Sequence, residues 1–114
     1  MLAEVASTLK SHLRAHDLIC RWGGEEFLIM VELAEYSEKA EGKLHQLAAE
    51  LVQAVRNLNW TAICPELDRV TVSAGTKIFR SGMAFQACVD AADHALLQAK
   101  RSGRNRVMTA VNPS

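Results

Sequence analysis

Apolar residues recur at intervals of three and four in three stretches of the chain, which is the pattern of amphipathic helices. The first predicted helix runs from the start to about Arg14, the second from Ser37 to Leu58, and the third from residue 85 to 99. Ser37 can cap its helix, and Gly103 suits the end of the third. The apolar positions are Leu2, Val5, Ala6, Leu9, Leu13, Ala40, Leu44, Leu47, Ala48, Leu51, Val55, Leu58, Phe85, Val89, Ala92, Leu96 and Ala99.

Shorter runs rich in branched and aromatic residues predict strands between these helices. Two of them, residues 18–20 and 27–31, flank Gly23 and Gly24, so they predict a β-hairpin over residues 18–31. A third strand is expected from residue 70 to 79 and a last short one from 106 to 110. The order of helices and strands indicates an α+β fold with a largely antiparallel sheet. Trp22 and Trp60 are expected to serve packing.

Composition narrows the class of protein further. The 114 residues make one small domain, and 13 basic residues balance 13 acidic ones, so no general attraction to nucleic acid or an acidic membrane is expected. No apolar run approaches the ~20 residues of a membrane span, and the start lacks the features of a signal peptide. The three cysteines have no Cys-x-x-Cys spacing, which indicates free thiols in a reducing cytosol.

The hairpin carries the first candidate chemistry. Gly23 and Gly24 would let the phosphates of a ligand approach the backbone, and the carboxylates of Glu25 and Glu26 could hold a divalent metal. Because neighbouring side chains of a strand point to opposite faces, only one of the two can easily reach a given site. The alternative is an ordinary hairpin with two acidic residues after its turn.

Basic residues near the end of the chain form a second candidate. Lys100 and Arg104 are four residues apart, so on a continuing helix they would share a face and could hold an anion between them. The alternative is a solvated basic helix end that is favoured by the helix dipole.

Four stretches resemble the GGDEF family, the bacterial diguanylate cyclases. Residues 21–27, Arg-Trp-Gly-Gly-Glu-Glu-Phe, are similar to its signature in the Gly-Gly-Glu-Glu-Phe form. Residues 14–17 match the Arg-x-x-Asp of its inhibitory site, with five residues between Asp17 and Gly23. Residues 70–75 resemble its Val-Thr-Val-Ser-x-Gly strand, and residues 91–107 its closing helix with a Lys-x-x-Gly-Arg-Asn ending. The four motifs occur in the family's order and span nearly the whole chain.

The resemblance implies an enzyme that condenses two GTP molecules into cyclic di-GMP and releases two pyrophosphates. Each domain would hold one GTP, so catalysis would need a homodimer, with Mg²⁺ or Mn²⁺ as the cofactor. Glu25 and Glu26 would be the catalytic, metal-binding carboxylates beside the two glycines. Lys100 and Arg104 would bind the triphosphate of the substrate.

Arg14 and Asp17 would bind cyclic di-GMP as an inhibitor, because a guanidinium fork suits a guanine edge or a phosphate and a carboxylate accepts from guanine nitrogens. The family often adds an arginine from the following helix, and residues 47–53 contain none. From the residues alone, Arg14 and Asp17 would be a local ion pair. An alternative function is a receptor module that binds cyclic di-GMP and makes none.

The family fold is a ferredoxin-like, palm-type antiparallel sheet with helices. Residues 1–110 match its later two-thirds, and residues 111–114 are a tail. The family's first strand, which is central and carries a metal-binding aspartate, and its first helix have no counterpart in this chain. The isolated 114 residues are therefore expected to be inactive. The place of the missing strand would be filled by further sequence of a longer protein or by another chain. A cytosolic location is expected, alone or as the cytosolic part of a larger sensor protein.

Overall fold

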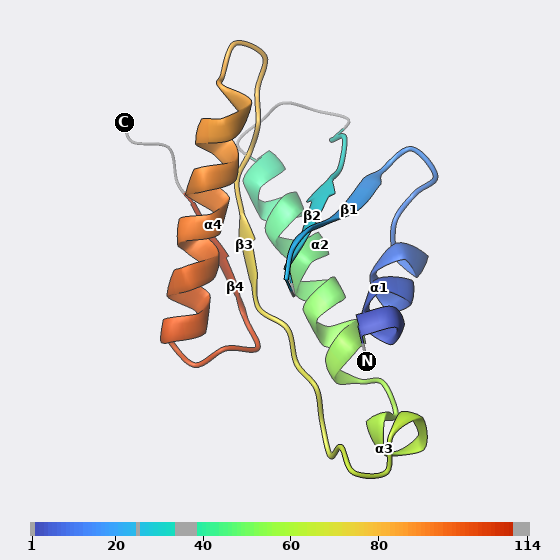
Figure 1. Cartoon of the computed structure of the whole chain (residues 1–114). Helices are drawn as coiled ribbons and strands as arrows, with labels where there is room; N and C mark the ends of the chain where they lie inside the picture. The colour runs from blue at the N-terminus through green and yellow to red at the C-terminus, as the bar shows by residue number, and fades with distance from the viewer. Residues whose placement is uncertain (1, 25, 34–38, 111–114) are drawn as a thin grey trace.

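The computed structural model (Figure 1) describes residues 2–24, 26–33 and 39–110. Its helices and strands follow the predicted order, with one extra short helix, α3. In chain order they are α1 (Leu2–Ser11), β1 (Leu18–Gly23), β2 (Glu26–Met30), α2 (Lys39–Arg56), α3 (Trp60–Ile63), β3 (Ala74–Thr76), α4 (Phe85–Arg101) and β4 (Val107–Thr109). The α+β class is confirmed.

The helix ends differ from the predicted ones by a few residues. α1 ends at Ser11 and not at Arg14, because the backbone N–H groups of His12 and Leu13 bond three residues back, to Leu9 and Lys10. Such tighter bonds close the last turn of a helix. α2 ends at Arg56, two residues before Leu58. The predicted cap Ser37 lies outside the described residues.

The strands form two separate two-stranded sheets. β1 and β2 pair antiparallel, as expected of the hairpin, with an irregularity between Arg21 and Gly23. β3 and β4 are parallel, because α4 carries the chain back between them. Within the described part of the chain, no ladder of hydrogen bonds joins β2 to β3.

The predicted strand over residues 70–79 is regular only in β3. Residues 70–73 have no strand beside them in the described chain, so they lack the ladder bonds that define a strand. Val70 and Val72 nevertheless pack against the core, as their alternation predicts. The apolar pattern thus located the segment correctly but overestimated how much of it pairs.

The core lies where α1, α2 and α3 meet. Trp60 is 1% exposed, and its indole N–H donates a 2.9 Å hydrogen bond to the carbonyl of Val55. Trp22, by contrast, is 48% exposed, so the packing prediction is confirmed for Trp60 and wrong for Trp22. The buried members of this core are Val5, Leu9, Leu51, Val55 and Trp60, with Ile19, Phe27 and Ile29 of the hairpin packed against them.

A second packed region places α4 against the β3–β4 pair, which α2 covers from the other side (Figure 1). Ala95 and Ala99 of α4 are buried there. A Cβ atom at Gly75 of β3 would collide with backbone atoms of Ala92 and Leu96. Glycine is therefore what allows α4 to lie directly on β3.

The state of the cysteines and the hydrophobicity of the helices bear on the environment of the chain. All three cysteines are free thiols, as predicted: Cys20 is exposed, Cys64 half-buried and Cys88 buried. Among the described residues, none of the helices combines the length and hydrophobicity that crossing a membrane requires.

Candidate functional site

The glycine turn of the hairpin is open, as the sequence predicts. Gly24 has φ of +45°, a left-handed conformation that favours glycine. Apart from their neighbours in the chain, no described residue places an atom within 4 Å of a Cβ built on Gly23 or Gly24. Arg21 stabilises the turn, because its Nε donates a 2.8 Å hydrogen bond to the carbonyl of Gly24. The exposed backbone is accessible to a ligand, whereas Glu25 lies outside the described residues.

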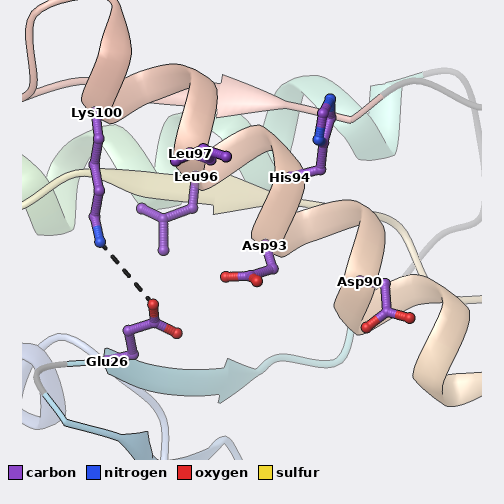
Figure 2. A pocket seen from close by; sticks show the side chains of 7 residues that line it. All are labelled: Glu26, Asp90, Asp93, His94, Leu96, Leu97 and Lys100. Carbon is purple, nitrogen blue, oxygen red and sulfur yellow. Dashed lines mark ion pairs between the residues drawn. The ribbon is translucent and has the colours of Figure 1, made fainter.

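Glu26 begins β2 and faces α4 (Figure 2). Its Oε1 lies 4.0 Å from the ammonium nitrogen of Lys100, close to the end of α4. The two side chains are 39% and 37% exposed, so solvent screens the pair and it contributes little to stability. The fold therefore brings together one carboxylate of the hairpin motif and one cation of the closing helix.

A hollow of about 360 Å³ lies between β2 and α4, around this pair. Among the described residues, its charged lining is Glu26, Asp90, Asp93 and Lys100, which is three carboxylates and one ammonium. An excess of carboxylates favours a ligand that brings cations with it, such as a metal-bound phosphate, over a bare anion. The full lining is Glu26, Asp90, Asp93, His94, Leu96, Leu97 and Lys100.

Sequence reasoning did not single out Asp90 and Asp93 as site residues. The signal was nevertheless present, since Asp90, Asp93, Leu97 and Lys100 follow one another at intervals of three, four and three. That spacing places them on one face of a helix. Counting backwards from Lys100 along its own helix face would have found them.

Arg104 does not share a helix face with Lys100, so the predicted placement is wrong. α4 ends at Arg101, where the N–H of Ser102 makes a last helical bond to the carbonyl of Gln98. Gly103 then has φ of +132° and Arg104 has φ of +60°. The chain thus turns out of the helix before Arg104, which is an exposed residue of the following loop.

The described residues include no group of three or more histidine, cysteine, aspartate or glutamate side chains placed to hold a metal ion together. Mg²⁺ does not need such a group, because it is often held by one or two carboxylates together with substrate phosphates. Glu26, with its carboxylate on the hollow, is an oxygen donor of the type that Mg²⁺ prefers. The donors that are present therefore fit this ion.

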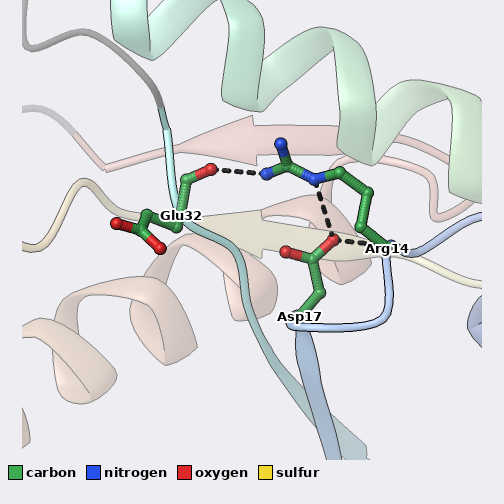
Figure 3. Close-up of polar contacts among 3 residues, drawn as sticks. All are labelled: Arg14, Asp17 and Glu32. Atoms are coloured by element: carbon green, nitrogen blue, oxygen red, sulfur yellow. Dashed lines mark hydrogen bonds and ion pairs between the residues drawn. The ribbon is translucent and has the colours of Figure 1, made fainter.

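Arg14 and Asp17 lie together in the turn before β1 (Figure 3). The backbone N–H of Arg14 donates to Asp17 Oδ2 over 2.8 Å, and Arg14 Nε lies 3.5 Å from the same oxygen. The guanidinium also donates from Nη2 to the carbonyl of Glu32. The side chain of Arg14 is 57% exposed, and that of Asp17 only 3%.

Asp17 is held as a carboxylate by these contacts. The hydrogen bond from the backbone N–H of Arg14 is the main cause that lowers the pKa of Asp17 below its ordinary value. Its other oxygen, Oδ1, is buried and has no hydrogen-bond partner within the described residues. The pair therefore combines an exposed guanidinium with a buried carboxylate oxygen whose acceptor capacity is unfilled.

Comparison with known proteins relates the chain to one family. A family model described as "Diguanylate cyclase, GGDEF domain" matches residues 1–106. The chain is 39% identical over 110 residues to the uncharacterized protein YtrP of Bacillus subtilis, covering 95% of the chain and 17% of that protein. It is 35% identical over 115 residues to diguanylate cyclase DgcP of Pseudomonas aeruginosa, covering 96% of the chain and 16% of that protein.

The fold is similar to that of solved GGDEF domains. The crystal structure of the GGDEF domain of DgcB from Caulobacter crescentus, in complex with c-di-GMP, superposes with a TM-score of 0.78 at 28% identity. This match covers 96% of the chain and 62% of the solved one. By contrast, the chain spans only about a sixth of the length of YtrP and of DgcP.

Proposed function

Because the chain belongs to the GGDEF family of diguanylate cyclases, we propose that it forms part of a catalytic domain that condenses two GTP molecules into cyclic di-GMP and releases two pyrophosphates. The observation that carries this proposal is the approach of Glu26 to Lys100 across the hollow between β2 and α4. It joins, in one place, the hairpin that would receive the nucleotide and a cation that would bind its phosphates.

Each residue of the proposed site would contact a different part of the bound nucleotide and metal. The ammonium of Lys100 would attract the triphosphate, and the open backbone of Gly23 and Gly24 would let the nucleotide approach. Glu25 and Glu26 would be the carboxylates that hold Mg²⁺ or Mn²⁺ on the phosphates. The bound metal would neutralise phosphate charge and lower the pKa of the attacking 3′-hydroxyl of the second GTP. Arg104 would bind the triphosphate tail from the loop after α4.

The Arg14–Asp17 pair would bind the product and thereby limit the reaction. Arg14 already holds its guanidinium in a fixed orientation through Asp17 and Glu32, so less side-chain freedom would be lost on binding. Oδ1 of Asp17 is buried and has no hydrogen-bond partner among the described residues, so it would accept from a guanine N–H after the side chain turns toward the ligand. This site lies at the start of β1 and is distinct from the hollow beside α4.

The domain would extend beyond these residues. Within the described residues, β2 and β3 are not joined to each other, and a further strand that paired with both would connect the two sheets. We place residues 1–110 in a larger GGDEF domain that supplies this strand. Since each domain would hold one GTP, two domains would face each other in a homodimer. GTP as the substrate points to the bacterial cytosol.

A second candidate function is a receptor that binds cyclic di-GMP without making it. It is favoured by the Arg14–Asp17 arrangement, in which an exposed guanidinium lies beside an ionised carboxylate with unfilled acceptor capacity. The full-length protein incubated with GTP and Mg²⁺ distinguishes the two. An enzyme yields cyclic di-GMP and pyrophosphate, which chromatography separates. Binding of added cyclic di-GMP with no product from GTP would establish the receptor and overturn the enzyme.

A further inference from the structure

The loop after α4 holds three consecutive residues in left-handed backbone conformations. Gly103, Arg104 and Asn105 have φ values of +132°, +60° and +51°. Glycine adopts such values readily, but a residue with a side chain does so only when its surroundings impose it. Two such residues in succession, one of them a proposed phosphate ligand, call for contacts that hold them there.

Hydrogen bonds from two segments hold this loop. The N–H of Arg104 donates to the carbonyl of Ala99 in α4 over 2.9 Å. The N–H of Asn105 donates over 3.1 Å to the hydroxyl of Ser73, which lies far earlier in the chain, directly before β3. The pairing of β3 with β4 begins beside it, where the N–H of Ala74 donates to the carbonyl of Arg106 over 3.0 Å.

Ser73 is therefore a side chain from outside the loop that ties it to the rest of the fold, while within the loop Arg106 Nε donates to the carbonyl of Arg104 over 3.1 Å. The two backbone–backbone bonds named above need no particular side chain, since any residue supplies their atoms. Both Ser73 and Asn105 are half-buried, so water competes weakly for this bond. A change of backbone conformation at Arg104 would redirect its Cα–Cβ bond and with it the whole guanidinium.

We propose that Ser73 is a positioning residue for nucleotide binding: its hydroxyl holds Asn105 and thereby keeps Arg104 in the left-handed conformation that presents its guanidinium to the triphosphate. This inference rests on the proposed function of Arg104 and extends it to a residue with no contact of its own to the ligand. It also gives the Val-Thr-Val-Ser segment a role at the site, beyond the packing of Val70 and Val72.

The test measures binding of a non-hydrolysable GTP analogue with Mg²⁺ to the full-length protein by calorimetry. We expect Ser73→Ala to weaken binding about tenfold, which corresponds to ~1.4 kcal/mol. Ser73→Thr keeps the hydroxyl and should bind within about twofold of the parent, the scatter expected for a conservative change. Arg104→Ala should weaken binding by at least as much as Ser73→Ala.

The double variant separates positioning from a general structural role. If Ser73 acts through Arg104, then adding Ser73→Ala to Arg104→Ala should weaken binding no further. Two results would overturn the inference while leaving the role of Arg104 intact. In one, the fold-losses of affinity of the two single variants multiply in the double variant; in the other, Ser73→Ala binds the analogue with unchanged affinity. An unchanged affinity of Arg104→Ala would instead refute the proposed function of Arg104 itself, and the inference with it.

A second pair of variants tests the loop conformation directly and remains decisive if Ser73→Ala does not fold, as judged by circular dichroism. Asn105→Gly tolerates a positive φ, whereas Asn105→Val strongly disfavours it. We expect parent-like binding of the GTP analogue by the glycine variant and binding weakened about tenfold or more by the valine variant. Equal affinities of the two variants would show that the left-handed conformation has no part in binding.

Discussion

Glu26 of β2 and Lys100 of α4 face each other across a hollow, with Oε1 and Nζ 4.0 Å apart. They lie far apart in the sequence, and within the described residues the sheet that contains β2 shares no ladder with the β3–β4 sheet on which α4 packs. Their half-exposed ion pair contributes ~0–1 kcal/mol at most to stability. Lys100 is thus free, at small cost, to exchange this carboxylate for a phosphate.

Replacing Lys100 by alanine should therefore impair substrate binding far more than folding. We expect Lys100→Ala to raise KM for GTP about tenfold or more, since a charge-assisted contact contributes ~1.5–3 kcal/mol. The control is Arg101→Ala, the next residue of α4, which is exposed and does not line the hollow. Steady-state kinetics of both variants give the comparison. Equal KM values for the two would show that Lys100 has no specific role.

Alanine at Arg14 or Asp17 should weaken binding of cyclic di-GMP well beyond tenfold. Each change removes a charged partner, and a tenfold loss corresponds to only ~1.4 kcal/mol. His16→Ala is the control, because His16 lies between the two in sequence and is exposed. Calorimetry on the full-length protein measures all three variants. Parent-like affinity in both Arg14→Ala and Asp17→Ala would refute the inhibitory site.

The pKa of Asp17 predicts how stability changes in acid. Because the N–H of Arg14 lowers this pKa in the folded protein, ionised Asp17 stabilises the fold at any pH above its ordinary, unfolded pKa. This contribution is lost as the pH falls through the lowered, folded value. Asp17→Asn should thus cost stability at neutral pH, and the difference from the parent should shrink as the solution is acidified. Urea unfolding at several pH values measures it, and a constant difference would contradict the prediction.

The sequence predicted the elements whose apolar pattern repeats. α1, α2, α4 and the hairpin lie close to their expected places because their packing against the core follows the periodicity of their own residues. The short helix α3 was missed, since four residues contain no complete repeat. It depends on Asn59, whose side chain accepts from the N–H of Ala62, and on the burial of Trp60.

What depends on neighbouring segments was predicted less well. Residues 70–73 have the alternation of a strand, but pairing needs a partner that the pattern does not reveal. Gly103 was correctly expected at the end of α4, yet the left-handed conformation continues through Arg104 and Asn105. That continuation separates Arg104 from Lys100, and it depends on a hydrogen bond to Ser73 that no local pattern encodes.

Gly75 should tolerate no side chain. Its Cβ position is occupied by the backbone of α4, so Gly75→Ala must push the helix away from β3, and overpacking of this kind costs ~1–3 kcal/mol. Gly42→Ala is the matched control, because Gly42 lies in α2 with open space around it, and alanine there should stabilise by ~0.5–1 kcal/mol. Thermal unfolding should give opposite shifts of Tm. A parent-like Tm for Gly75→Ala would contradict the close contact.

The most direct test of the central claim is the conversion of GTP by the Glu25→Gln variant of the full-length protein. The substitution keeps the size of the side chain but removes the charge that would hold the metal. Its control is Glu66→Gln, an exposed residue of the connector between α3 and β3. With GTP and Mg²⁺, we expect the parent and Glu66→Gln to form cyclic di-GMP and Glu25→Gln to form none. Two results would contradict a diguanylate cyclase that works through this carboxylate. Glu25→Gln could make cyclic di-GMP at the parent rate, or the parent itself could make none.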